Sequence, residues 1–215
     1  RQYYGLPYVN SSVDDFPDSS NPYTGKFDAL TDCWQLHYSG TTVYNSYYSG
    51  THTANYGIRG DIFGYTREGV WQTVRWCWLL LENVDRVPGM GEDEKVKMKA
   101  EAKCLIAARY FDMFRHYGGL PLIYASFMGT ETNYQLPRAT VEETVNYMDK
   151  MLEEAIESGG LKWAYEGADF NSDSGHWTLA GAMALRCKLW QFAASPLFND
   201  TQGYAGGRSE AEQQH

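Results

Sequence analysis

The stretch AEAKCLIAARYFDMFRHYGGLPLI, residues 100–123, decides the fold. Its apolar residues recur at helical spacing and also occupy other faces, so it predicts a helix that is apolar on most sides and lies inside the protein. Gly118-Gly119 predicts the C-terminal end of this helix, because glycine adopts the left-handed conformation of a helix cap. Leu120-Pro121-Leu122-Ile123 then continues as extended chain, since proline disfavours helix in the residue before it. The expected apolar positions are Ala102, Leu105, Ile106, Ala107, Tyr110, Phe111, Met113, Phe114 and Tyr117.

Three further helices are predicted around this stretch. A helix that starts near Val70 is ended by Pro88-Gly89, and a second begins at the capping box Thr140-Val141-Glu142-Glu143 and is stopped by Gly159-Gly160. A last helix ends at Ser195-Pro196. Their expected apolar positions are Val70, Val74, Cys77, Leu81 and Val84, then Val141, Val145, Met148, Leu152 and Ala155, then Leu179, Ala182, Met183, Leu189, Trp190 and Ala193. Two antiparallel pairs of this kind predict an all-α, tetratricopeptide-like helical-repeat scaffold.

The chain divides into three parts that differ in composition and in sequence pattern. Residues 1–65 are rich in Gly, Ser, Thr, Asn and Tyr and carry many turn signals, so we expect a long loop-rich, aromatic-rich segment with one short helix near residues 28–38. Residues 66–200 form the expected helical scaffold. Residues 201–215 are polar and follow glycines, which is typical of a loop, and we expect this to be a point of truncation of a longer protein.

Composition and charge favour a neutral ligand. The chain has 17 Tyr and 7 Trp and a formal net charge of -9, with no basic run. Nucleic acids and anionic lipid headgroups need a cationic surface and are therefore excluded as partners. Aromatic rings among polar side chains suit a sugar, whose apolar face stacks on a ring while its hydroxyls form hydrogen bonds.

Neither a metal site nor a catalytic centre is predicted. Cys33, Cys77, Cys104 and Cys187 are widely spaced, and three of them lie in helical stretches where a free cysteine acts as a small hydrophobic residue. Residues 169–175 alternate oxygen-bearing side chains like the start of a calcium loop, but they lack the glycine and the bidentate glutamate, so we expect a turn. The remaining candidates also lack metal-site or catalytic spacing, and we expect no cofactor and no enzyme activity. They are the acidic loop with Asp14, Asp15 and Asp18, the histidines His37, His52, His116 and His176, and the carboxylate pairs Glu142-Glu143 and Glu153-Glu154.

Four stretches of the helical part form one recognisable set. They are residues 71–75 with 80–85, residues 100–123, residues 137–143 with 149 and 152–155, and residues 178–199. In order and content they resemble the SusD/RagB family of outer-membrane nutrient-binding lipoproteins, most specifically through residues 100–123. Trp78 stands where that family usually has Asn, and Ile106 where it usually has Arg, which leaves the subfamily open.

This resemblance implies a function as well as a fold. It implies a SusD-like helical scaffold whose loops bind an oligosaccharide without catalysis, in a protein seated on a SusC-like TonB-dependent transporter. It also implies a lipid anchor on the extracellular face of the outer membrane, and an amino-terminal portion of a longer protein. An oligopeptide-binding member of the same family and a helical-repeat scaffold for protein interaction remain the alternatives.

The ligand contacts implied by the resemblance come from the segment before the first scaffold helix. That segment combines aromatic rings with side chains that hydrogen-bond to sugar hydroxyls. The candidate ligand-binding residues are Asp32, Trp34, Tyr44, Tyr47, Tyr48, Asn55, Tyr56, Arg59 and Asp61.

Overall fold

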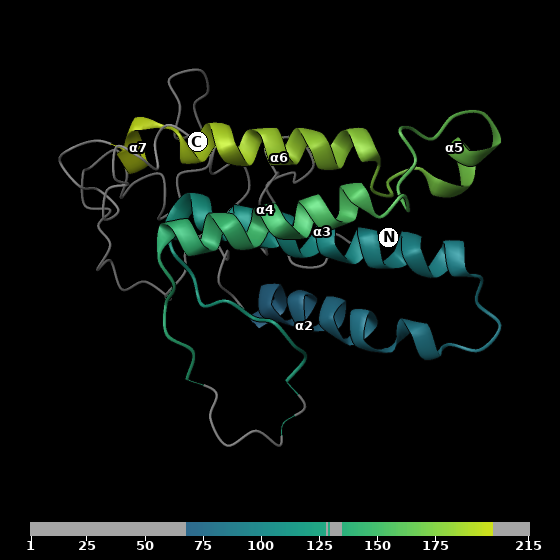
Figure 1. Ribbon diagram of the computed structural model, residues 1–215, viewed down its shortest axis with the longest axis horizontal. Coiled ribbons are helices and arrows are strands. Elements are labelled where there is room, and N and C mark those ends of the chain that lie inside the picture. The colour runs from purple at the N-terminus through teal and green to yellow at the C-terminus, as the bar shows by residue number, and fades with distance from the viewer. Residues whose placement is uncertain (1–67, 128, 130–134, 200–215) are drawn as a thin grey trace, which may run out of the picture. The chain divides into compact units, whose positions relative to one another are not determined.

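The computed structural model describes residues 68–127, 129 and 135–199 (Figure 1). The expected loop-rich segment 1–65, its short helix at residues 28–38 and the polar segment 201–215 lie outside these residues, so the expected division of the chain stays a prediction. The described elements are α2 (Glu68–Asn83), η2 (Val84–Arg86), α3 (Glu92–Tyr117), α4 (Val141–Glu157), α5 (Ala168–Asp173), α6 (Leu179–Ala193) and α7 (Pro196–Asn199). All of them are helical, which confirms the predicted all-α class.

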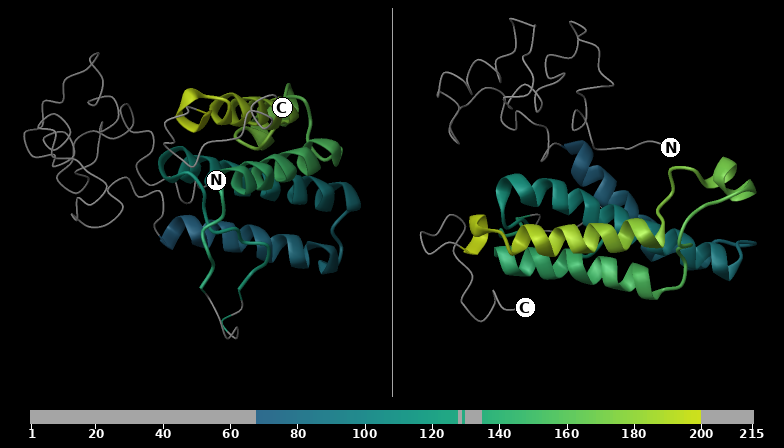
Figure 2. Two further views of the ribbon diagram at one scale, coloured as in Figure 1. Left: turned by 60° about the vertical axis from the view of Figure 1, so that its left-hand side comes forward. Right: turned by 90° about the horizontal axis from the view of Figure 1, so that it is seen from above.

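The four long helices lie side by side, and successive helices run in opposite directions (Figures 1 and 2). Helix α4 packs against both α3 and α6, and α3 also contacts α6. The two expected pairs therefore form one continuous stack. Within the described ranges, no helix combines the length and the apolar character needed to cross a membrane.

Helix α3 is the inner helix of the stack, as its sequence predicts. Ile106, Tyr110, Met113 and Phe114 are fully buried, whereas Leu105 and Tyr117 are half-buried at the edges of the packed surface. The rings of Phe114 and Phe198 stack with their centroids 5.0 Å apart. Helix α7 is thereby packed against the C-terminal end of α3.

The predicted boundaries of the helices follow local chemistry. Thr140 and Glu143 form the expected capping box, in which each side chain accepts a hydrogen bond from the backbone N–H of the other residue. Gly118 has a φ of 69°, and its N–H donates to the carbonyl oxygen of Phe114, which ends α3 where predicted.

The predicted face of α6 is wrong at one position. Ala182, Leu189 and Ala193 are buried, but Met183 is 47% exposed. Met183 follows Ala182 directly, so its side chain projects about 100° further around the helix. Helix α6 contacts the stack through a narrow stripe that does not reach that far.

Polar side chains join α6 to α4. The guanidinium of Arg186 donates to both carboxylate oxygens of Asp149, over 2.7 and 2.9 Å, and to Glu153 over 3.0 Å. The indole N–H of Trp190 donates to Asp149 over 2.7 Å. Planar, bidentate pairs of this kind fix orientation as well as distance, so they set how α6 lies on α4.

The cysteines of the described helices are free thiols. Cys77 and Cys104 are buried, and burial raises the pKa of their thiols to about 11 and about 12. They act as small hydrophobic residues, as expected. Cys187 does not, because it lies on the exposed face of α6. Cys33 is outside the described residues.

Candidate ligand-binding surface

The nine predicted ligand-binding residues all lie in residues 1–67, outside the described part of the chain. Their role stays a prediction. The described residues offer three other places that could serve a ligand. These are an extended strap after α3, a pocket at the end of α3, and the connection between α4 and α6.

The strap is residues 120–127, an irregular segment that crosses the helix stack. The hydroxyl of Tyr110 donates to the carbonyl oxygen of Pro121 over 2.9 Å and accepts from the N–H of Ile123 over 3.0 Å. The hydroxyl of Tyr147 donates to the carbonyl oxygen of Ile123 over 2.5 Å. Burial raises the pKa of both tyrosines, so both hydroxyls stay protonated at neutral pH.

Side chains of α2 and α4 hold the ends of the strap. At its start, the N–H of Leu120 donates to the hydroxyl of Thr144 over 3.1 Å. At its end, the N–H of Ser126 donates to Glu82 over 2.8 Å, the hydroxyl of Ser126 bonds to the same carboxylate, and Arg75 Nε donates to the carbonyl oxygen of Phe127 over 2.9 Å. The hydrogen bonds from Ser126 lower the pKa of Glu82. The strap is therefore tied to three helices.

Tyr124 is the exposed aromatic residue of the strap. Its side chain is 63% exposed. Its ring meets the ring of Tyr147 edge to face, with centroids 5.2 Å apart and an angle of 88°. Tyr147 in turn contacts Tyr110 at 4.8 Å, and Tyr110 contacts Trp71 at 6.0 Å. A row of rings thus runs from the half-buried Trp71 through the buried Tyr110 and Tyr147 to the exposed Tyr124.

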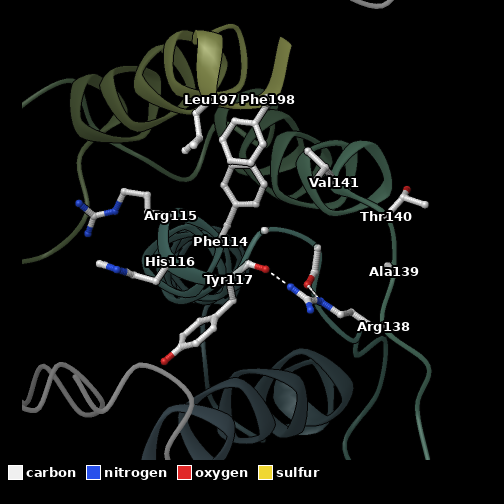
Figure 3. Close-up of a pocket in the computed structure, with 12 residues that line it drawn as sticks. Phe114, Arg115, His116, Tyr117, Arg138, Ala139, Thr140, Val141, Leu197 and Phe198 are labelled. Carbon is white, nitrogen blue, oxygen red and sulfur yellow. Dashed lines mark hydrogen bonds between the residues drawn. The ribbon is translucent and has the colours of Figure 1, made fainter. Parts of the chain in front are cut away.

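A pocket of about 490 Å³ lies at the C-terminal end of α3 (Figure 3). It is formed by the last turn of α3, the start of α4 and helix α7. The lining residues are Phe114, Arg115, His116, Tyr117, Gly118, Gly119, Arg138, Ala139, Thr140, Val141, Leu197 and Phe198.

The polar groups of this pocket already serve the helix ends. Arg138 Nε donates to the carbonyl oxygen of Gly119 over 2.6 Å, and its terminal nitrogen bonds to the carbonyl oxygen of Tyr117, as the dashed lines in Figure 3 show. A cation at this position satisfies carbonyls that the helix leaves unpaired and complements the negative end of its dipole. Arg115 is bonded to Asp112 over 2.7 Å. Both arginines of the pocket therefore already have structural roles, and we propose no ligand for the pocket.

The connection between α4 and α6 is residues 158–178, and its part from residue 161 to residue 178 is here called the α5 segment. It carries Trp163 and Phe170, which are 64% and 58% exposed. Within the segment, Lys162 forms an exposed ion pair with Asp169, and His176 Nδ1 lies 2.9 Å from a carboxylate oxygen of Glu101 on α3.

A buried tyrosine anchors the same segment. The hydroxyl of Tyr165 donates to the carbonyl oxygen of Trp177 over 3.2 Å. Lys97 lies over the Tyr165 ring, 5.2 Å from its centroid, and bonds to Asp173. This hydrogen bond, with a second from Ser172, lowers the pKa of Asp173 to about 2. The α5 segment thus depends on charged groups more than the strap does.

The calcium-like stretch at residues 169–175 is not a simple turn. Its first part belongs to the short helix α5, and a turn follows at Ser174 and Gly175. Asp169 and Asp173 are paired with Lys162 and Lys97, so their carboxylates already have cationic partners. Among the described residues, no group of three or more His, Cys, Asp or Glu side chains could hold a metal ion. Asp14, Asp15 and Asp18 lie outside that part of the chain.

Sequence reasoning missed the residues that build the strap. Glu82 and Arg75 look like the solvated face of α2, and Tyr110 and Tyr147 look like ordinary core residues. The helical period gives no sign that these side chains bond to a segment far along the chain. The one local signal is the extended Leu120-Pro121-Leu122-Ile123, which shows that an irregular segment begins there.

Comparison with solved structures gives three informative neighbours of this fold. A SusD-like protein from Bacteroides fragilis is 26% identical over 59% of this chain and 24% of its own, with a TM-score of 0.51. A laminarin-binding SusD-like protein is 26% identical over 60% of this chain and 28% of its own, also at 0.51. Surface glycan-binding protein A from Bacteroides thetaiotaomicron, solved with laminarihexaose, is 18% identical over 63% of this chain and 26% of its own, with a TM-score of 0.50. At this identity the likeness shows the fold alone.

This chain is much shorter than those neighbours. It spans between 24% and 28% of their lengths. No family model matches the sequence, and neither does any curated protein. The likeness found by these comparisons is therefore one of helix arrangement.

Proposed function

We infer that this chain, whose helices have the SusD-like fold, is part of a cell-surface protein that binds glycans without altering them. The main observation behind the proposal is that the sequence resemblance and the structural likeness fall on the same helices. The four SusD/RagB-like stretches fall on α2, α3, the start and end of α4, and α6 with α7, in a stack similar to a laminarin-binding SusD-like protein.

The chemistry of the chain supports a neutral, hydroxyl-rich ligand. A net charge of -9 is unfavourable for phosphate-rich partners, and the many tyrosines and tryptophans supply stacking surfaces. We propose that Asp32, Trp34, Tyr44, Tyr47, Tyr48, Asn55, Tyr56, Arg59 and Asp61 contribute ligand contacts. Non-catalytic binding fits the neighbours, which are described as SusD-like or glycan-binding.

The finer part of the proposal concerns location and partner. By its likeness to SusD/RagB lipoproteins, the protein would be lipid-anchored at the extracellular face of the outer membrane. It would deliver its glycan to a SusC-like TonB-dependent transporter. Isolating the tagged protein from membranes should then bring a barrel of that class with it, whereas isolation without any such barrel would contradict this part.

Binding of saccharides is the direct test of the proposal. The full chain is applied to an array of neutral glycans that includes laminarin fragments, and each hit is measured by calorimetry. We expect saturable binding of at least one oligosaccharide class. Binding of peptides in the absence of any saccharide binding would replace the glycan by an oligopeptide.

Substitution of two predicted contact residues separates ligand binding from a protein-interaction scaffold. Trp34→Ala and Tyr48→Ala should each weaken glycan binding by about 1–2 kcal/mol if their rings stack on sugar. Assembly with the transporter should be unaffected. Loss of assembly with unchanged glycan affinity would instead favour a scaffold that binds proteins.

A further inference from the structure

We propose that the ring of Tyr124 is a sugar-stacking platform on the helical scaffold, held in place by the strap at residues 120–127. The proposal rests on the proposed glycan-binding function and adds a contact outside the predicted segment 1–65. It assigns a ligand class, a neutral pyranose of a glycan chain, to a residue that the sequence stretches do not single out.

The first step is the rigidity of the backbone that carries Tyr124. Seven side-chain hydrogen bonds tie the strap to the helices. Four of them involve Leu120, Pro121 and Ile123, and three involve Ser126 and Phe127. Tyr124 is therefore fixed on both sides although its backbone belongs to no helix or strand. Ordering such a segment has an entropic cost, and here the helices supply the bonds that offset it.

The second step is the exposure of the ring. Ile123 is half-buried and Ser126 is buried, whereas Tyr124 is 63% exposed. The edge-to-face contact with Tyr147 supports the ring without covering it. Tyr147 is itself buried, and its hydroxyl donates to the strap, so the supporting ring is packed in the core. A ring ordered before binding loses little side-chain freedom when a ligand stacks on it, which favours affinity.

The third step is the chemistry around the ring. Polar groups of α2 bond to the end of the strap, at residues two and three positions after Tyr124: the carboxylate of Glu82 accepts from Ser126, and the guanidinium of Arg75 donates to the carbonyl oxygen of Phe127. A sugar needs one apolar surface and hydrogen-bonding groups at its edge. The strap combines an exposed ring at Tyr124 with polar groups at its end, and this combination suits a pyranose.

The α5 segment provides a matched control. Trp163 is 64% exposed, about as much as Tyr124. Trp163 belongs to a different connection, between α4 and α6, so losing its ring removes similar aromatic surface away from the strap. Under this proposal Trp163 does not contact the glycan.

The test uses the full chain, and its probes are laminarihexaose and any neutral oligosaccharide that the array identifies. Tyr124→Ala should raise Kd roughly tenfold, which is the effect expected for loss of one stacking ring. Tyr124→Phe keeps the ring and should stay within about twofold of the unaltered chain, and so should Trp163→Ala. Circular dichroism and thermal unfolding check that each variant is folded.

The outcomes separate this inference from the proposed function. If Tyr124→Ala binds like the unaltered chain while Trp34→Ala is weakened, the platform is overturned and the glycan-binding function stands. Equal weakening by Tyr124→Ala and Trp163→Ala also overturns it, because the effect would not be local. If the unaltered chain binds no saccharide, the proposed function and the platform fail together. Reduced isolation of a transporter barrel, with sugar affinity unchanged, would place Tyr124 in a protein interface instead.

Discussion

The strap and the α5 segment are both irregular connections that expose large aromatic residues, yet they are held by different interactions. Four of the seven hydrogen bonds that fix the strap join its backbone to the neutral hydroxyls of Tyr110, Tyr147 and Thr144. Ion pairs at the surface hold much of the α5 segment, and one of them, Lys162 with Asp169, is 61% and 48% exposed. Exposed ion pairs are weakened by water and salt, whereas part-buried hydrogen bonds between neutral groups are much less sensitive to salt. Exposure alone therefore does not make an aromatic residue a pre-organised binding surface.

The largest expected difference between the two regions comes from their glycines. A Cβ added at Gly119, just before the strap, would lie 2.0 Å from the backbone oxygen of Ala139. Gly119→Ala should therefore destabilise the protein by about 3 kcal/mol or more, since backbone atoms must move. Gly167 of the α5 segment has open space but a φ of 59°, so Gly167→Ala should cost about 1–3 kcal/mol.

Urea unfolding of both variants measures these costs. Gly91→Ala serves as the control, because Gly91 has open space and a φ of -66°, which alanine adopts without strain. If Gly119→Ala proved no more harmful than Gly167→Ala, the strap would not be packed as closely as described.

The next effect concerns one hydroxyl in each region. Tyr110→Phe leaves the carbonyl oxygen of Pro121 and the N–H of Ile123 without their partner, so we expect a loss of about 1–3 kcal/mol in the free energy of unfolding. Tyr165→Phe removes a single hydrogen bond, to Trp177, and should cost about 0.5–1.5 kcal/mol. Equal losses in chemical denaturation would remove the distinction between the two connections.

As the pH falls, the α5 segment should loosen at a higher pH than the strap. This is the smallest of the three effects that we predict for these two regions. The hydrogen bond from Lys97 lowers the pKa of Asp173 from 3.8 to about 2. A lowered pKa means that the folded state favours the carboxylate, so this contribution is complete above about pH 4 and is lost as the pH falls towards 2. High salt should weaken the same contact.

Amide hydrogen exchange between pH 5 and pH 2 checks this order. The amides of α5 should exchange faster as the pH falls, after correction for the intrinsic rates. Residues 120–127 include no acidic residue, and the carboxylate that bonds to the strap, Glu82 of α2, also has a pKa lowered by the hydrogen bonds from Ser126. Faster exchange at Ile123 than in α5 would contradict the comparison.

The helices and their ends could be predicted because their signals are local. The apolar faces of α3, the glycine cap at Gly118 and the capping box at Thr140 each need only neighbouring residues. Met183 was placed wrongly because a nearly uniform apolar helix does not show which of its faces meets a neighbour. That information lies in the packing of α6 on α4.

The anchoring residues could not be predicted for a different reason. Glu82, Asp149 and Arg138 lie in the SusD/RagB-like stretches, but helical periodicity assigns them only to polar faces or loop ends. Their partners, Ser126, Arg186 and the end of α3, are remote in sequence. The nine predicted ligand residues lie outside the described part of the chain, so the candidate site there is still a prediction from the sequence.

A backbone hydrogen bond joins the two ends of the connection between α3 and α4. The N–H of Ala139 donates to the carbonyl oxygen of Leu120 over 3.1 Å, so the two ends of the connection lie next to each other. Closing a longer loop costs little more, about 0.6 kcal/mol for each doubling of its length. Insertions or exchanged sequences between Phe127 and Arg138 should therefore be tolerated by the helical scaffold. The length and sequence of this connection can then diversify in evolution, or be engineered, while the scaffold stays the same.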